Sequence, residues 1–430
     1  MRVEQIAFPA IRKLAEHTRL ADAVFRLVRT ENPFSPEFYV NPYPRTDKLW
    51  ARGPVFFHRI FGQWIVIGYD EVQELLRSND TAVSGTVELL LSIRPYSALS
   101  DQAKTTFRKW VLVTDPPDHT RLRSLVSRAF TTKRIASWEP RIQAVADALI
   151  EAMRNTDEPD VVTSFTTRLP IYVIGDILGL PRDRWDWLKE TSDVIASLLD
   201  PFLSFDPVVM NRHFADLDAY FREVAAQRRA APQDDLISVL VQASDGDALT
   251  DEELIAMIEI LMIAGHETTT GMLGNAIVAL AAHPEQRELF RQRPDMRENA
   301  IEELIRFDTS VHSGVRVATK EITLGGRTIK TGARVAILWG AANRDPRRWP
   351  DANELHLDRE NPRPISFGHG IHHCIGAALA RLEMRVGLGA FIDAFGDYTL
   401  DENKIKWKKS GTLRGPVLLP IQRETPTTLR

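Results

Sequence analysis

The chain has 430 residues, of which 44% are hydrophobic and 26% charged, and its formal net charge is −4. This near-neutral balance gives no support for general nucleic-acid binding. The single cysteine excludes an intramolecular disulfide and a four-cysteine zinc site, and it argues against a disulfide-built secreted protein. The length allows two or three domains, or one large one.

The N-terminal stretch is broken by charges and by Pro9, so no run approaches the roughly 20 apolar residues that a membrane anchor needs. No signal-peptide core is evident. Spaced apolar residues over 10–29 predict an amphipathic helix packed on the body, with a membrane-surface helix as the alternative. Residues 30–50, rich in Pro, Asn and aromatic residues, predict an extended loop.

The next segments change from strand to helix character. Residues 54–68 predict two short strands around Gly62. Asp70 is predicted to cap a helix that runs through Leu76. Residues 80–110 show no clear period and predict a mobile opening. Helical periodicity then covers about 118–130, 137–154, 166–179, 183–199, 208–229, 250–282 and 294–307.

Strand character returns over 315–340, with a turn at Gly325-Gly326. Residues 375–394 are helical, and strands are predicted within 398–423. The sum is mainly α with small β-sheets, and the missing βαβ alternation argues against a doubly wound fold. Because no linker is visible, we expect a single domain over 1–430, with an N-terminal helix and extended loop in 1–50 and the core in 54–430.

The long helix of 250–282 carries a polar island, Glu267-Thr268-Thr269, between apolar residues. Unpaired polar groups are costly inside a buried helix. Thr268 can bond back to the carbonyl of Ala264, which opens or bends a helix. The resulting notch could hold dioxygen and water. The alternative is that these polar residues face another helix or solvent.

Two further pairs share helix faces. Glu303 and Arg306 lie three apart, so their side chains meet, although such pairs occur often by chance. His119 and Arg123 lie four apart and share one face. The alternative for the cations is an ordinary surface position.

The only cysteine lies in the run Phe367-Gly-His-Gly370-Ile-His372-His-Cys374-Ile-Gly376. A helix sequence follows, so the sulfur is predicted at a helix N-terminus, where unpaired N–H groups favour a thiolate. Cys374 could ligate a metal cofactor, act as a nucleophile with His373, join a compressed His/Cys zinc cluster, or be a plain buried cysteine.

This run resembles the haem-ligand loop of the cytochrome P450 family (F-x-x-G-x-H-x-C-x-G), and every specified position matches. The resemblance implies the P450 fold around a buried haem b with Cys374 as the iron ligand. Further resemblances extend it over nearly the whole chain. The implied cofactor-binding residues are His119, Arg123, Ala264, Arg316, Phe367, Gly368, His372, Cys374 and Gly376.

Residues 264–269 resemble the family's oxygen-activation motif, A-G-x-E-T-T. The resemblance implies that Thr268 holds the oxygen and water network and that Glu267 relays protons. Glu303 and Arg306 resemble the family's E-x-x-R pair, with Arg359 as the third member of a structural charge network. His119, Arg123, Arg316 and His372 are the implied partners of the haem propionates.

The resemblance implies a soluble, bacterial-type, cytoplasmic monooxygenase without a membrane anchor. It would hydroxylate or epoxidise a substrate with O2 and two electrons from NAD(P)H, delivered by a separate ferredoxin or flavodoxin and its reductase. The cations Arg108, Lys109, Arg121 and Arg128 suit an acidic ferredoxin. The alternatives are a peroxide-driven peroxygenase, a haem-binding sensor or carrier without turnover, and, more remotely, a zinc or thiol hydrolase.

The substrate is only broadly specified. By resemblance, it is expected to contact residues 84–100, 195–210, 311–315 and 412–413, together with Ile263 and Ala264. The first two ranges are largely apolar, which favours a lipid, terpenoid, steroid or aromatic compound over a sugar. His312 is a candidate for binding a polar group of the substrate, or a bystander.

Overall fold

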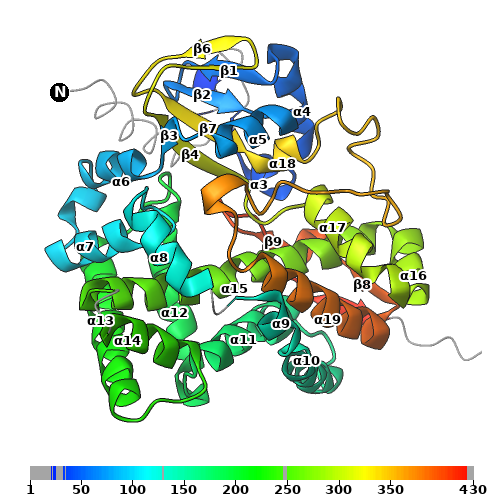
Figure 1. The fold of residues 1–430 in the computed structure, drawn as a ribbon. Helices are drawn as coiled ribbons and strands as arrows, with labels where there is room; N and C mark the ends of the chain where they lie inside the picture. Colours follow the sequence, from blue (N-terminus) through cyan, green and yellow to red (C-terminus); the bar gives the residue numbers. More distant parts are fainter. Residues whose placement is uncertain are drawn as a thin grey trace, which may run out of the picture.

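The computed structural model describes residues 21, 23–25, 32–33, 35–127, 130–245 and 249–423. Figure 1 shows two regions: blue and yellow strands at one end, and green, cyan and orange helices at the other. Element labels follow that figure. The protein is mainly helical with small sheets, as the sequence predicts.

The largest sheet joins distant parts of the chain. Its order is β1-β2-β7-β4-β3, and all pairs are antiparallel except β2 with β7. The parallel pair aligns Trp64 with Val335, so it fixes the early hairpin to the late strands. Its strands are β1 (Val55–His58), β2 (Gln63–Val66), β3 (Thr81–Ala82), β4 (Ser313–Ala318) and β7 (Arg334–Leu338).

Three two-stranded sheets complete the β structure of the described residues. One of them is a hairpin that turns at Gly325 and Gly326. Both glycines adopt positive φ, and this is the turn predicted from the sequence. The pairs are β5 (Ile322–Leu324) with β6 (Arg327–Ile329), β8 (Tyr398–Leu400) with β11 (Ile421–Arg423), and β9 (Lys406–Trp407) with β10 (Pro416–Leu418).

Helix α15 (Asp251–Ala282) lies across the middle of the molecule in Figure 1. A capping box begins it: Thr250 accepts from the Glu253 amide, and the Glu253 carboxylate accepts from the Thr250 amide. It is buried along most of its length, because helices pack on it from several sides. It is therefore the fixed element against which a central site can be built.

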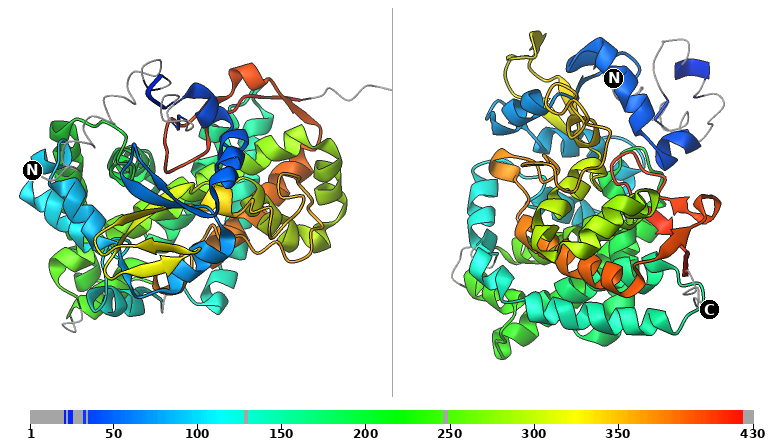
Figure 2. Two further views of the ribbon diagram at one scale, coloured as in Figure 1. Left: turned by 90° about the horizontal axis from the view of Figure 1, so that it is seen from above. Right: turned by 90° about the vertical axis from the view of Figure 1, so that its right-hand side faces the viewer.

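The other helices pack around α15 and on one another. α19 contacts α15, α10 and α17, and Figure 2 shows it from two further sides in orange. The helices are α3 (Pro36–Val40), α4 (Tyr43–Leu49), α5 (Tyr69–Arg77), α6 (Ser84–Leu91), α7 (Asp101–Lys109), α8 (Asp118–Ser127), α9 (Thr132–Ala136), α10 (Glu139–Arg154), α11 (Arg168–Leu178), α12 (Trp185–Ala196), α13 (Pro207–Ala230), α14 (Leu236–Asp245), α16 (Pro284–Gln292), α17 (Arg297–Phe307), α18 (Trp339–Ala342) and α19 (Ala377–Phe395).

Three local predictions are wrong. Residues 36–49 form α3 and α4 rather than an extended loop, because Ser35 caps the first and prolines lie in the first turn of both. Residues 84–109 contain α6 and α7, which are too short to show a clear period. Asp70 lies inside α5, whose N-cap is Gly68. The helix predicted over 10–29 lies largely outside the described residues.

No helix among the described residues is both long enough and apolar enough to cross a membrane.

Candidate active site

A cavity of about 530 Å³ lies between α15 and the cysteine loop, which we define as residues 367–376. Residues of strand β4, of helix α6 and of the segments 196–202 and 411–413 also line it. Most of its lining is apolar. The predicted site residues that line it are Arg123, Ala264, Glu267, Thr268, Arg316, Phe367, Gly368, His372, Cys374 and Gly376.

The cysteine loop turns sharply before α19. Cys374 donates its backbone N–H to the carbonyl of Phe367 at 2.8 Å, which closes the loop. Gly370 has φ +69°, and a Cβ there would lie 2.1 Å from the Leu76 carbonyl oxygen, so only glycine fits. α19 begins at Ala377 with Gly376 as its N-cap, so the sulfur stands close to a helix N-terminus, as predicted.

The thiol of Cys374 faces the cavity. Burial among protein atoms raises its pKa, while the Gly376 backbone N–H and the guanidinium groups of Arg123 and Arg381 lower it. A bound metal ion deprotonates a coordinating thiol outright. The loop therefore supplies groups that stabilise a thiolate, but the protein groups alone leave the pKa raised.

Arg123, Arg316 and His372 line one rim of the cavity, and His119 contacts His372 without lining the cavity itself. The rings of His119 and His372 lie 4.1 Å apart between centroids. Burial lowers the pKa of His372 to about 3, and Arg316, His119 and Arg123 contribute to that lowering. Arg123 also donates to the carbonyl of His373 at 2.5 Å.

The two histidines of this rim have unpartnered ring nitrogens within the described part of the chain. Both ring nitrogens of His119 and Nε2 of His372 are buried and have no hydrogen-bond partner there. Burial lowers the pKa of Arg316 to about 10, since Asp115 compensates only in part. Buried donors normally have partners. Two carboxylates entering the cavity would satisfy them, so this donor set and the facing thiol fit a haem with its two propionates.

The opposite wall is the polar island of α15. Thr268 Oγ1 donates to the carbonyl of Ala264 at 3.1 Å, the back-bond that the sequence predicts. Gly265 lets α11 approach closely, because a Cβ there would lie 2.8 Å from Ile174. Ala264 and Thr268 line the cavity. His266 points away, is fully buried, and contacts the Met262 carbonyl and Ser192.

Glu267 has a partner that the sequence analysis missed. Its carboxylate forms an ion pair with Lys408, which follows β9. The Glu267 side chain is 11% exposed and that of Lys408 is 33% exposed. Burial lowers the pKa of Lys408, and Asp193 raises it. No spacing rule joins these residues, so only the tertiary structure identifies the pair.

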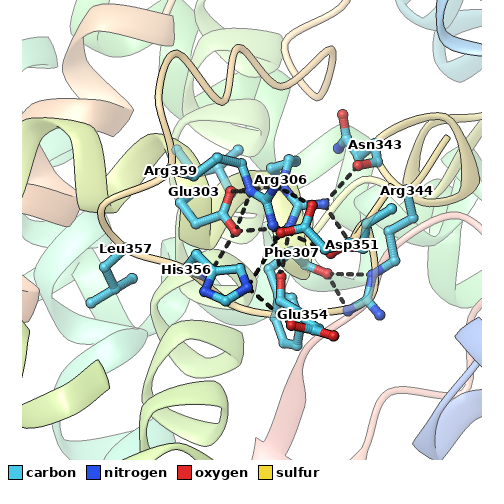
Figure 3. A network of polar contacts seen from close by, with 12 residues as sticks. Glu303, Arg306, Phe307, Asn343, Arg344, Asp351, Glu354, His356, Leu357 and Arg359 are labelled. Atoms are coloured by element: carbon cyan, nitrogen blue, oxygen red, sulfur yellow. Dashed lines mark hydrogen bonds and ion pairs between the residues drawn. The ribbon is translucent and has the colours of Figure 1, made fainter. Parts of the chain in front are cut away.

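The predicted charge network of Glu303, Arg306 and Arg359 is present, as Figure 3 shows. Glu303 and Arg306 form two hydrogen bonds of 2.6 and 2.8 Å, and both side chains are 0% exposed. Arg359 adds contacts to Glu303 at 3.0 and 3.1 Å. Arg306 also donates to the carbonyls of Asn343, Ala352 and Glu354.

Asn343 links this network to the loop. Its Oδ1 accepts from the Ile365 amide at 2.8 Å, and its Nδ2 donates to Ser366 Oγ at 2.7 Å. Phe367 follows directly and accepts from the Cys374 amide. The buried charges are therefore connected to the cysteine by a continuous series of contacts along the chain and through hydrogen bonds.

The predicted substrate-contact ranges meet at the cavity in part. Residues from 84–100, 195–210, 311–315 and 412–413 line it, together with Ile263 and Ala264. His312 does not line it: its ring contacts Tyr43 at 5.7 Å between centroids, and its Nε2 lies 3.7 Å from Asp308. Its Nε2 is oriented toward that buried carboxylate.

Two of the four predicted docking cations are engaged. Arg108 pairs with Glu88 at 2.7 Å, and Arg121 pairs with Glu253 at 2.5 Å. Lys109 is half-buried, and Arg128 lies outside the described residues.

The comparisons with known proteins agree with this geometry. The cytochrome P450 family profile matches residues 62–423. The monooxygenase PikC of Streptomyces venezuelae is 33% identical over 398 residues, which cover 90% of this chain and 92% of PikC. The vitamin D(3) 25-hydroxylase of Pseudonocardia autotrophica is 35% identical over 395 residues, which cover 90% of this chain and 95% of that enzyme.

A solved structure shows the same fold. P450BioI, in complex with hexadec-9Z-enoic acid ligated acyl carrier protein, matches with a TM-score of 0.84 at 30% identity. The match covers 90% of this chain and 99% of P450BioI. Since the profile and the relatives each span most of the sequence, this chain belongs to the cytochrome P450 family and is a monooxygenase of that family.

Proposed function

We propose that this monooxygenase binds haem b through Cys374 and inserts one oxygen atom of O2 into an apolar small molecule. The other oxygen atom leaves as water, with two electrons taken from NAD(P)H and two protons from the solvent. The observation that carries the proposal is one cavity with a thiol on one wall and a threonine notch opposite, together with a rim of two guanidinium groups and imidazole nitrogens that have no partner among the described residues. A thiolate-ligated haem supplies the oxygen activation, because the thiolate favours O–O cleavage.

In this proposal four residues bind the propionates: His119, Arg123, Arg316 and His372. Charge-assisted hydrogen bonds would satisfy the ring nitrogens of the two histidines, which have no partner among the described residues. The macrocycle would lie between Ala264 on one side and Phe367, Gly368 and Gly376 on the other. Lining of the cavity by these residues supports that placement.

The proposed catalytic pair is Glu267 and Thr268. The Thr268 hydroxyl would hold the water that delivers protons, because its bond to the Ala264 carbonyl keeps it at the cavity wall. Glu267 would pass protons inward from the solvent side, since its carboxylate is reached by the partly exposed Lys408. Proton relays of this kind need groups within hydrogen-bond reach.

The proposed electron donor is a ferredoxin or flavodoxin with its NAD(P)H reductase, which suits a cytoplasmic enzyme. It would dock on the solvent side of the cysteine loop, where Ile371 and His373 are exposed. Because Arg108 and Arg121 are paired with carboxylates, we expect only a modest salt dependence of the reduction rate.

The proposed substrates are lipids, steroids or related apolar compounds. The cavity lining supports this class, with Leu90, Leu199 and Phe202 among the residues that form it. The names of three relatives mention apolar compounds of this class. They are a vitamin D(3) 25-hydroxylase, a P450 crystallised with testosterone and another crystallised with myristic acid. These names describe the relatives, and for this enzyme they define a screening set.

The test is the absorbance spectrum of purified protein, reduced with dithionite under carbon monoxide. We expect a strongly red-shifted Soret band in the native enzyme and its loss in Cys374→Ser. Ile371→Ser, a change at an exposed position of the same loop, is the matched control and should keep the band. Protein that purifies without haem after haem-supplemented expression would overturn the proposal, and the His/Cys loop should then be assayed for zinc.

A further inference from the structure

Glu267 is held by a residue from a distant part of the chain. Lys408 lies just after β9, and its ammonium group pairs with Oε1 of Glu267. Among the described residues, the Lys408 side chain makes no other hydrogen bond or ion pair. The position of the proposed proton-relay carboxylate therefore depends on the place of one lysine.

The lysine also stands beside α12. Asp193 attracts its ammonium group, and Lys189, which pairs with Asp193 at 2.6 Å, repels it. Potential ligand atoms of Asp193, His266 and Glu267 lie within 4.8 Å of one another. Lys408 places its ammonium group beside the carboxylates of Asp193 and Glu267, so a cation from the protein itself balances their negative charge.

Lys408 begins a segment that faces the cavity. We define the substrate-facing loop as residues 408–415, whose ends are joined by a hydrogen bond from the Lys408 amide to the Gly415 carbonyl at 3.0 Å. Gly411, Thr412 and Leu413 in this loop line the cavity. A substrate that fills the cavity therefore touches the loop that carries Lys408.

The tip of this loop is fixed to the other side of the pocket. Asp200 Oδ2 accepts from Ser410 Oγ at 2.5 Å and from the Gly411 amide at 2.8 Å. Asp200 lies between Leu199 and Pro201, which also line the cavity. Two parts of the substrate wall are thus joined, and Lys408 connects both to α15.

We propose that Lys408 is a positioning residue that couples the substrate-facing loop to Glu267, so that a bound substrate sets the carboxylate's position for proton delivery. The proposal rests on the proposed function and extends it to a regulatory contact within the same site. A loop displaced by substrate shifts the ammonium group and, with it, the carboxylate that it holds. Protons would then reach the Thr268 notch when a substrate is bound and not when the cavity is empty.

The geometry differs from that of a purely structural ion pair. Arg306 makes contacts to one carboxylate and three backbone carbonyls, so its loss would disturb several segments at once. The Lys408 side chain makes one ion pair among the described residues and is 33% exposed, so its displacement would break no other hydrogen bond or ion pair there.

The first test is hydrogen exchange of the haem-loaded enzyme and needs no substrate. Lys408→Met and Glu267→Gln should each raise exchange in the peptide 408–415 by about fivefold, and the double variant should add nothing further. Lys408→Arg should restore protection. Lys406→Met, which removes an exposed lysine from β9, should leave exchange unchanged. Unaltered exchange in Lys408→Met would overturn the coupling.

The second test measures the product formed per NAD(P)H with a compound selected from testosterone, myristic acid and hexadec-9Z-enoic acid by its spin-state shift. Lys408→Met should lower that ratio several-fold, with rescue in Lys408→Arg and no change in Lys406→Met. If Thr268→Ala lowers the ratio but Lys408→Met does not, the coupling is wrong and the proposed function stands. If the Soret band of Cys374→Ser equals that of the native enzyme, the proposed function itself is wrong.

Discussion

The two walls of the cavity are held in opposite ways. Beneath the cysteine loop, Glu303 and Arg306 are fully buried and share their contacts with Arg359 and several backbone carbonyls. On α15, Glu267 is held by Lys408, whose side chain is about one-third exposed to solvent. The first wall is held by many mutually dependent buried charges, whereas the link from the second wall to Glu267 is a single, partly exposed ion pair.

The comparison shows how one enzyme combines a rigidly held cysteine loop with a substrate wall that can adapt. A buried ion pair that loses one partner leaves an uncompensated charge, so its geometry tolerates little change. A partly exposed pair exchanges with water at little cost. We therefore expect substitutions beneath the cysteine loop to reduce stability and haem content, and substitutions above α15 to alter coupling and substrate binding.

The largest expected effect is that of Glu303→Ala. It leaves Arg306 and Arg359 without their shared carboxylate, and removing one partner of a buried pair costs about 3–5 kcal/mol. Denaturant unfolding and haem content measure the outcome, and both should fall sharply. The control is Asp295→Ala, which breaks an exposed pair with Arg293 and should leave both unchanged. Equal stability of the two variants would contradict the comparison.

Gly370→Ala should be the next most damaging change. The left-handed backbone costs about 1–2 kcal/mol for a residue with a Cβ, and the enforced shift of the Leu76 carbonyl adds about 1–3 kcal/mol. Gly326→Ala is a matched control, because Gly326 has nearly the same φ and a Cβ added there would have no neighbour within 4 Å. The difference between the two unfolding free energies isolates the contact with Leu76.

Asp200→Ala tests the adaptable wall. Removing the acceptor of Ser410 and the Gly411 amide should cost about 1–3 kcal/mol of stability, less than Glu303→Ala. The spin-state titration should shift more than the unfolding free energy does, because residues 411–413 line the cavity. A titration curve that matches the native enzyme, together with a large loss of stability, would place Asp200 with the fixed wall instead.

Glu383→Gln is the smallest expected change, and it is stabilising. Burial raises the pKa of Glu383 well above its usual value, and no partner is present for its Oε2 among the described residues. A raised folded-state pKa means that the native enzyme loses stability as pH rises from the usual glutamate range toward that raised value.

The variant carries no titrating group there, so its advantage should be absent below pH ~4 and should grow at higher pH. The burial cost of the neutral amide offsets part of this, which leaves about 1 kcal/mol at neutral pH. Unfolding measured against pH checks the prediction, with Glu285→Gln, an exposed glutamate on α16, as the control. An advantage that is largest in acid would contradict it.

Local sequence signals predict the parts of the site that are close in sequence. The cysteine loop, the Ala264–Thr268 back-bond and the Glu303–Arg306 pair each depend on spacings of a few residues. Long helices such as α15 are also predicted to within a residue or two. The short helices α3, α4, α6 and α7 are not, because capping and tertiary packing rather than periodicity define them.

Tertiary pairs give no comparable signal. Lys408 and Asp200 are ordinary polar residues in the sequence, and nothing local connects the first to Glu267 or the second to Ser410. His312 is a candidate for the substrate site on the basis of its neighbours along the chain, yet its ring turns toward Asp308 and Tyr43. A side chain's direction is decided by packing partners that the local sequence does not specify.

Arg414 joins the two ends of the chain, so these contacts form only late in translation. Its guanidinium group donates to the carbonyls of Tyr39 and Val40 and pairs with Asp308. Arg414 is translated 375 residues after Tyr39, which takes roughly 20–75 s at typical elongation rates. During that interval the early segment lacks its final anchor on the ribosome. The enzyme therefore completes its fold late, after nearly the whole chain has been translated.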